Sequence, residues 1–220
     1  MIFGSAYRLN KLSEKSLSLS VNHFKVESTN TYKYFGVTLD STLSFNDHFD
    51  KSLKKASSRV NLLKKIRQSI NLHSAEMIYR AMIIPILTYC SPVVLSYCPT
   101  KHNKINRLEN RIEHVISYGR NVDLKLPSVK NMISNRTCTL VYDSLNGHTC
   151  ELFENYFKLL EHSHNTRHNK KSIYVPKVNT ESCKKAFFFL GAKLFNDLPL
   201  HVRNMDDRSL FKSGLKKVFE

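Results

Sequence analysis

The chain has 220 residues, enough for one ordinary domain or two small ones with a buried core. Its 34 lysines and arginines outnumber 18 acidic residues, and the resulting formal net charge of +16 favours a polyanionic partner. The composition, with 41% apolar residues and only six glycines and six prolines, excludes a chain that is disordered throughout and a collagen-like or linker sequence.

β-Branched and aromatic residues predict a β-hairpin near the N-terminus. From Ser18 to Asp40 they occur in two alternating runs, and the polar segment Glu27–Asn30 separates these runs. We expect the two runs to be the two strands of one hairpin.

Apolar residues at spacings of three and four predict two helices after this hairpin. The first is long, begins at Ser44 or Asn46 and reaches about Ile70. The second covers residues 74–84, where Pro85 disturbs it because proline cannot continue a helix.

The remaining sequence is also typical of helices. Apolar residues from Ile105 to Ile116 define a third helix, which Gly119 ends. A looser segment surrounds Pro176. Further helices are expected near residues 128–145, 151–161, 184–195 and 208–219. The predicted fold class is therefore mainly α, with an N-terminal β-hairpin.

Basic residues concentrate on one face of the first long helix. Between Lys51 and Arg67 the sequence has seven basic residues and no acidic one. At about 100° per residue, four of them fall within a sector of about 100° opposite the apolar stripe. These four are Lys51, Lys54, Lys55 and Lys65. Such a row can follow phosphates and bind them in a strongly salt-dependent way, whereas the alternative is a solvated face that keeps the helix polar.

The third helix repeats this basic arrangement. Lys104, Arg107 and Arg111 share one of its faces, although Glu109 and Glu113 dilute their charge. We expect these three basic residues to add to the same nucleic-acid contact.

Cysteine usage and hydropathy indicate an intracellular protein without a membrane span. The five cysteines are widely spaced and form no C-x-x-C pair, and the first residues form no apolar leader, which favours a reducing compartment. Nucleus and cytoplasm cannot be distinguished. The most apolar stretch, residues 75–98, contains Glu76, Arg80, Pro85 and Pro92, so we expect no contact with a membrane.

Histidines near residue 165 are the candidate metal ligands. His162, His164 and His168, with Glu161 and Cys183, offer side chains that suit zinc. Their spacing matches no common zinc finger, so surface histidines in a basic loop are the preferred interpretation. We predict neither a metal nor a cofactor.

Several segments resemble one known family of enzymes. Residues 32–40, with the sequence YKYFGVTLD, followed by His48 and the lysine-rich helix, resemble the segment after the palm of reverse transcriptases from non-LTR retrotransposons of the jockey and chicken-repeat type. Further segments resemble the thumb-region helix and the tail of the same proteins, in the same order. These segments are residues 79–89, His164–Arg167, Leu194–Pro199 and Phe211–Lys216.

This resemblance implies roles for individual residues. The turn that contains Phe35, Gly36 and Val37 corresponds to the primer grip, which holds the 3′ end of the growing strand. A glycine allows the backbone to approach a ligand closely, although a tight bend in an ordinary strand is the alternative for Gly36. The long basic helix corresponds to a thumb helix along the minor groove of an RNA–DNA hybrid, where shape and phosphates are contacted.

The resemblance also implies that the catalytic centre lies outside this sequence. Polymerisation requires carboxylates that hold two metal ions, and the family carries them in palm strands that would lie upstream of Met1. Asp206 and Asp207 superficially resemble such a pair, but we expect them at the N-terminus of a helix. We therefore predict no catalytic residues and no enzymatic activity.

The resulting hypothesis is a C-terminal fragment of a retrotransposon reverse transcriptase with a thumb-like helical bundle. Residues 1–40 would form the end-of-palm hairpin, residues 41–120 the basic thumb-like helices, and residues 121–220 a C-terminal helical region. The expected partner is the backbone of RNA, DNA or an RNA–DNA hybrid, with no small-molecule substrate. The alternative is a stand-alone basic helical module that binds nucleic acid or an acidic protein.

Overall fold

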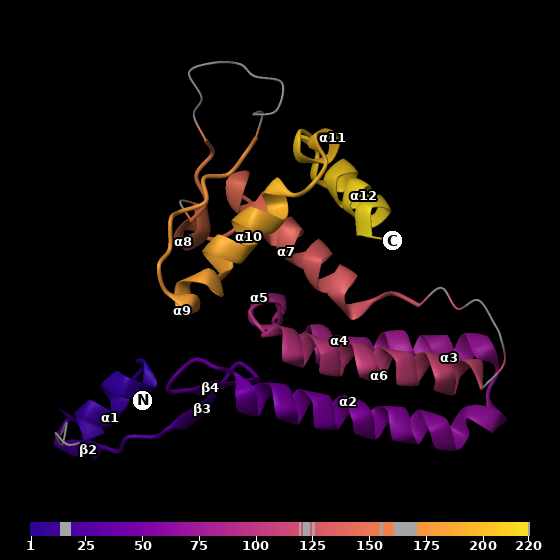
Figure 1. Ribbon diagram of the computed structural model, residues 1–220, viewed down its shortest axis with the longest axis horizontal. Coiled ribbons are helices and arrows are strands. Elements are labelled where there is room, and N and C mark those ends of the chain that lie inside the picture. The colour runs from indigo at the N-terminus through magenta and orange to yellow at the C-terminus, as the bar shows by residue number, and fades with distance from the viewer. Residues whose placement is uncertain are drawn as a thin grey trace. The chain divides into compact units, whose positions relative to one another are not determined.

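A computed structural model shows a mainly helical chain with small β-hairpins near its N-terminus, which confirms the predicted fold class (Figure 1). The structure describes residues 1–13, 19–118, 120, 124, 126–154, 156–160 and 171–219. The contacts within the chain define two compact units, Met1–Ser58 and Arg59–Glu220, and one continuous helix, α2, crosses their boundary. The functional division into residues 1–40, 41–120 and 121–220 stays a prediction.

The first unit contains two antiparallel hairpins and the start of a long helix. Strand β1 pairs with β2, and β3 pairs with β4. The elements are α1 (Ala6–Ser13), β1 (Leu19–Val21), β2 (Phe24–Val26), β3 (Thr31–Tyr34), β4 (Val37–Asp40) and α2 (Asn46–Ile66).

The prediction of one hairpin over Ser18–Asp40 was wrong, because each of the two runs folds back on itself. Asn22 and His23 have φ angles of 49° and 68°, and Phe35 and Gly36 have φ angles of 42° and 84°. Two consecutive left-handed residues form the two-residue turn whose twist matches that of antiparallel strands. The segment Glu27–Asn30, which we expected to be the turn, connects the two hairpins instead.

Asp40 shapes the connection between β4 and α2. Its carboxylate accepts hydrogen bonds from the Thr42 hydroxyl, from the Ser44 backbone N–H at 3.0 Å and from the Phe45 N–H at 2.7 Å. Partial burial acts to raise the pKa of Asp40, but these hydrogen bonds to the charged form outweigh it and lower the pKa to about 2. The ionised carboxylate therefore holds the chain in the bend that leads into α2.

His48 makes a second link between the strand and the helix. This side chain is buried, and its Nδ1 accepts a hydrogen bond of 3.5 Å from the backbone N–H of Thr38 in β4. The histidine that contributes to the sequence resemblance therefore positions the start of α2 in this chain.

Asp40 is expected to make the stability of the fold fall in acid. Because its pKa is about 2 in the folded chain and 3.8 as a reference, the ionised carboxylate stabilises the fold above about pH 4. This contribution is lost as the pH falls from about 4 to about 2. Urea unfolding across this interval should show a smaller loss of stability for Asp40→Asn than for the wild type. Equal losses in the two proteins would show that the carboxylate does not support the turn.

Among the described residues, the regular secondary structure of the second unit consists of helices and one isolated bridge between Leu159 and Ile173. Its elements after α2 are η1 (Arg67–Ser69), α3 (Leu72–Ile78), η2 (Tyr79–Ile83), α4 (Ile84–Thr88), α5 (Ser91–Leu95), α6 (Pro99–Ser117), α7 (Val129–Leu145), α8 (Glu151–Glu154), α9 (Glu181–Lys184), α10 (Phe187–Asn196), α11 (Leu200–Arg203) and α12 (Arg208–Phe219).

Most predicted helices are confirmed, with local corrections. Helix α2 ends at Ile66, and the 3₁₀ turn η1 follows it. The helical region does not reach Ile70, because this residue is already extended. The predicted disturbance at Pro85 takes the form of a π-helical turn, in which the Ile84 N–H donates to the Tyr79 carbonyl. Gly119, the predicted end of α6, lies outside the described residues, and Tyr118 adopts the left-handed conformation at that end.

Two predicted helices in the C-terminal half are shorter than expected. The helix expected over residues 151–161 is α8, which ends at Glu154, and Leu159 instead bridges Ile173. The helix expected over residues 184–195 is α10, which begins only at Phe187 because Ala186 is extended, and the short helix α9 ends at Lys184 before it. The predictions for residues 128–145 and 208–219 match α7 and α12.

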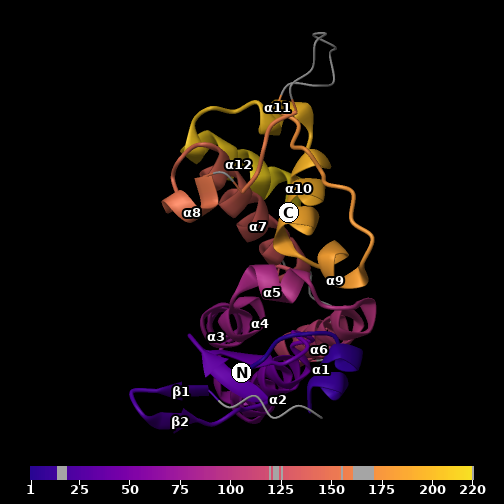
Figure 2. The same ribbon diagram turned by 90° about the vertical axis from the view of Figure 1, so that its left-hand side faces the viewer.

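The core of the C-terminal half lies between α7, α10, α11 and α12. Helices α10 and α12 both pack against α7, as Figures 1 and 2 show. Tyr142 of α7 stacks on Phe211 of α12 with 4.1 Å between the ring centroids. The other fully or largely buried members of this cluster include Cys138, Val141, Ile173, Ala192, Phe195, Leu198, Val202 and Leu215.

Asn196 joins this core to the chain segment around Ile173. Its side-chain oxygen accepts the Ile173 N–H at 2.9 Å, and its side-chain nitrogen donates to the Ile173 carbonyl at 2.8 Å. Ile173 is fully buried, so the Asn196 amide supplies both backbone partners that this residue would otherwise lack. Together with the buried Phe195 and Leu198, this clamp gives the segment Leu194–Pro199 a structural role.

None of the described helices is both long enough and apolar enough to cross a membrane.

Candidate nucleic-acid interface

The tip of the β3–β4 hairpin exposes aromatic side chains. Phe35 is 79% exposed and Tyr34 56% exposed, and their rings meet edge to face with 4.6 Å between the centroids. Gly36 is exposed beside them, whereas Val37 is 7% exposed and packs into the unit. Of the three residues assigned to the primer grip, two therefore lie at the surface of the tip and one anchors it.

The backbone of Phe35 is strained at this tip. Its φ of 42° lies in the left-handed region, which costs a residue with a side chain about 1–2 kcal/mol. Its ring gains little by burial in return, because most of the ring surface is exposed. Strained backbone that is retained without a packing benefit is typical of functional positions.

Helix α2 presents the predicted row of lysines to solvent. Lys51, Lys54, Lys55 and Lys65 are all exposed, while Phe49, Ala56, Val60 and Leu63 on the opposite side of the helix are buried. At 1.5 Å per residue the row extends over about 21 Å. We call these four residues the α2 lysine row.

Other basic residues of this helix are not part of the row. Lys64 is exposed but lies on another side of the helix, about 100° from Lys65. Arg67, which follows α2, donates to the Ile116 carbonyl at 2.7 Å and to the Ile70 carbonyl at 2.9 Å. The guanidinium of Arg67 therefore fastens the end of α2 to the end of α6.

Helix α6 carries the second basic face. Lys104, Arg107 and Arg111 are exposed, and their spacing of three and four residues places them in one stripe. The Arg111 guanidinium donates to the side-chain oxygen of Asn61, which belongs to the C-terminal part of α2. Within the second unit, this hydrogen bond brings the stripe next to the part of α2 that contains Lys65.

The acidic residues of α6, Glu109 and Glu113, lie on another side of this helix. The Glu109 carboxylate accepts the Val129 N–H at 2.6 Å and so caps the first turn of α7. Burial raises the pKa of Glu109, and the bond from Val129 acts in the opposite direction. Glu109 and Glu113 lie about 140–180° around the helix from Lys104, so their charges face away from the stripe.

These two carboxylates line a polar cleft that sequence patterns did not indicate. The cleft has a volume of about 400 Å³, and Tyr79, Asn106 and Pro127 also line it. The Tyr79 hydroxyl donates to the Pro127 carbonyl at 3.0 Å, and burial raises the pKa of this tyrosine above its ordinary value. Two carboxylates against the single ammonium group of Lys130 make this cleft less suited to phosphates than the α2 lysine row.

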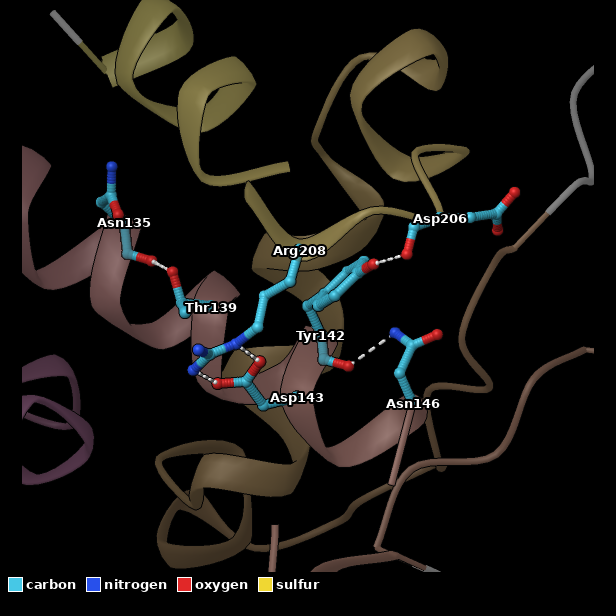
Figure 3. Close-up of polar contacts among 7 residues, drawn as sticks. All are labelled: Asn135, Thr139, Tyr142, Asp143, Asn146, Asp206 and Arg208. Atoms are coloured by element: carbon cyan, nitrogen blue, oxygen red, sulfur yellow. Dashed lines mark hydrogen bonds and ion pairs between the residues drawn. The ribbon is translucent and has the colours of Figure 1, made fainter. Parts of the chain in front are cut away.

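Asp206 and Asp207 lie at the N-terminus of α12, which confirms the prediction for them. The Asp207 carboxylate accepts the Leu210 N–H at 2.8 Å, the pattern of an N-cap. Asp206 forms an ion pair with Lys171, and its backbone carbonyl accepts the Tyr142 hydroxyl (Figure 3). The Asp207 carboxylate therefore caps α12, and the Asp206 carboxylate pairs with a lysine outside this helix.

The same helix start is held by a two-pronged ion pair. The Arg208 guanidinium donates to both oxygens of the buried Asp143 carboxylate, at 2.6 and 2.7 Å (Figure 3). The side-chain hydrogen bond and the charge of Asp143 raise the pKa of Arg208. This contact joins α12 to α7 beside the stacked rings of Tyr142 and Phe211.

Within the part of the chain that the structure describes, no three His, Cys, Asp or Glu side chains are grouped so that they could hold a metal ion. The predicted histidine cluster of His162, His164 and His168, like the family segment His164–Arg167, lies outside the described residues. All five cysteines are free thiols.

Comparison with known proteins identifies two polymerases of mobile elements as relatives. The chain is 29% identical over 126 residues to the RNA-directed DNA polymerase from mobile element jockey of Drosophila funebris. It is 24% identical over 142 residues to the probable RNA-directed DNA polymerase from transposon BS of Drosophila melanogaster. These matches cover 52% and 60% of the chain and confirm the resemblance.

The chain spans only a small part of these relatives. The matched segments amount to 14% of the jockey polymerase and 16% of the BS polymerase. No protein-family model matches the chain, and no solved structure matches it.

Proposed function

We propose that the chain is a thumb-like portion of a retrotransposon RNA-directed DNA polymerase, which grips template and primer and does not itself carry the catalytic carboxylates. The two polymerase relatives support the enzyme class. The exposed α2 lysine row supports the gripping role, and it is the observation on which this proposal mainly rests.

In this proposal the lysine row follows the phosphates of an RNA–DNA hybrid. A row of about 21 Å is long enough to meet several phosphates along a duplex groove. Lys104, Arg107 and Arg111 on α6 provide additional phosphate contacts, and the exposed Phe35 and Gly36 contact the primer end. Contacts to phosphates and sugars fix the position of a duplex without reading its sequence.

Competition binding tests this function against an acidic protein partner. The intact chain is titrated into a fluorescently labelled RNA–DNA hybrid, and unlabelled hybrid or poly-glutamate of equal total charge is added as competitor. We expect the hybrid to compete at least tenfold more effectively. Equal competition by poly-glutamate would contradict the gripping role and favour a basic module for acidic partners.

Primer extension with Mg²⁺ and nucleotides should yield no product, and extension by the purified chain would contradict the absence of a catalytic centre.

Phe35→Asn is expected to stabilise the hairpin and weaken binding of the hybrid. Asparagine adopts left-handed conformations more readily than phenylalanine, so the strain of about 1 kcal/mol should be relieved. Loss of the ring should lower affinity for a hybrid with a recessed primer end. Phe24→Asn is the matched control, because Phe24 is also 79% exposed but lies in β2. Unchanged affinity of Phe35→Asn, or an equal loss of affinity in Phe24→Asn, would show that Phe35 does not contribute specifically to holding the primer end.

A further inference from the structure

Arg203, the last residue of α11, is a buried cation with few partners. The residue is only 8% exposed. Its guanidinium carries five N–H donors, but among the described residues it makes a single hydrogen bond, from Nη1 to the Ser172 hydroxyl at 3.0 Å. The Nε atom of Arg203 is buried and has no hydrogen-bond partner in the part of the chain that the structure describes.

No described carboxylate forms an ion pair with Arg203. The ion pairs of the described residues include Lys171–Asp206, Lys184–Glu181 and Arg208–Asp143, and none of these involves Arg203. Burial lowers the pKa of Arg203, and the more distant charge of Asp197 acts in the opposite direction without reaching it. A buried charge without an opposite charge is costly, and native proteins normally pair it.

Three other arginines that join elements of the second unit have at least two acceptors each. Arg208 binds both oxygens of Asp143, and Arg67 binds two backbone carbonyls. Arg136 donates to both the hydroxyl and the carbonyl of Thr88. Arg203 differs from these three because, among the described residues, its guanidinium contacts a single neutral hydroxyl, which can itself donate a hydrogen bond.

Core residues hold both groups in place. Ser172 precedes Ile173, whose backbone is clamped by Asn196, and Arg203 follows Val202, which is fully buried. Asn204, the next residue in the chain, is exposed, and Ser172 is only partly buried, so the pair lies close to the surface. A fixed guanidinium beside a hydroxyl, close to solvent, is preorganised for a small oxyanion.

We propose that Arg203 and Ser172 bind a phosphate group. The guanidinium supplies charge and a planar fork of donors that matches phosphate oxygens, and the Ser172 hydroxyl can donate to a third oxygen. The phosphate is either free inorganic phosphate or a phosphate of a nucleic acid. This site joins the end of α11 to the segment that precedes Ile173, and it does not depend on the function proposed for the α2 lysine row.

Thermal unfolding of the full chain tests this site with inorganic phosphate. Unfolding temperatures are compared in phosphate and in chloride at equal ionic strength for the wild type, Arg203→Met and Arg8→Met, an exposed control in α1. Phosphate should raise the unfolding temperature of the wild type and of Arg8→Met by several degrees more than that of Arg203→Met. In chloride, Arg203→Met should be at least as stable as the wild type, because it removes a buried charge that has no counter-ion among the described residues. Equal phosphate effects in all three proteins would overturn the site.

Direct binding measurements identify the source of the phosphate. They also test the site if Arg203→Met does not fold, because Arg203→Lys is measured as well. Broadening of the ³¹P signal of inorganic phosphate is measured with the wild type, Arg203→Met and Arg203→Lys, which keeps the charge but loses the fork. Short single-stranded oligonucleotides with and without a 5′-phosphate are titrated in parallel. Broadening that depends on Arg203 supports free phosphate, and affinity that depends on both Arg203 and the 5′-phosphate supports a nucleic-acid end. If neither ligand distinguishes Arg203→Lys from the wild type, the proposal is wrong.

Discussion

Asn196→Ala is expected to lower the free energy of unfolding by about 2–5 kcal/mol, a large part of the 5–15 kcal/mol that typically stabilises a domain. The substitution removes both hydrogen bonds to Ile173 and leaves a buried N–H and a buried carbonyl without partners. Each such group costs about 1–3 kcal/mol.

The chemistry of the clamp requires an amide of this length. Asn196→Asp keeps an acceptor for the Ile173 N–H but places a second oxygen against the Ile173 carbonyl. We therefore expect Asn196→Asp to be nearly as damaging as Asn196→Ala.

Urea unfolding followed by circular dichroism measures these losses. Asn204→Ala serves as the control, because Asn204 is exposed, lies eight residues away and has ordinary right-handed backbone angles. Its stability should stay within about 0.5 kcal/mol of the wild type. A loss below about 1 kcal/mol for Asn196→Ala would show that the clamp is not important for the fold.

Replacing the α2 lysine row by glutamine is expected to weaken binding of an RNA–DNA hybrid by about 10²–10³-fold at about 0.1 M salt. Each lysine that neutralises a phosphate releases counterions into solution, and this release supplies most of the affinity of a backbone contact. The four side chains are exposed, and glutamine keeps their polarity, so the fold should be nearly unaffected.

A control with the same net charge separates a local contact from general attraction. Lys64, Lys193, Lys216 and Lys217 are exposed and lie outside the row, and changing all four to glutamine removes the same four charges. The fold-loss of affinity in this control should be at most about one tenth of the fold-loss in the row variant. Similar losses in the two variants would mean that only the total charge of the chain matters.

The helices could be predicted from the sequence because their burial follows a simple period. Apolar residues three and four apart define one face, and the remaining positions are exposed whatever the neighbouring elements are. The exposure of Lys51 and Lys65 and the burial of Phe49 followed from this rule alone.

The strand pairing could not be predicted because its turns lack the usual residues. A two-residue turn of this kind favours Asn-Gly, whereas the two turns here contain Asn22-His23 and Phe35-Gly36. The polar segment Glu27–Asn30 was the stronger turn signal, yet it connects the hairpins. The turn preferences of individual residues therefore did not decide the pairing, because the turns occur at residues whose backbone is strained.

The polar contacts of the second unit were also beyond sequence patterns. Glu109 caps a helix that begins 20 residues later, and Asn196 clamps a residue 23 positions earlier. Arg203 contacts Ser172 across 31 positions. Such partners are set by how the helices pack, and no periodicity along the chain reports them.

The salt dependence of hybrid binding tests the gripping role most directly. The association constant of the wild type and of the row variant is measured between about 0.05 and about 0.3 M salt, and its logarithm is plotted against the logarithm of salt concentration. Each phosphate contact contributes about 0.9 to the steepness of this plot, so the row variant should be less steep by about 3–4. Equal steepness in the two proteins would contradict the account, because it would show that these four lysines do not contact the nucleic-acid backbone.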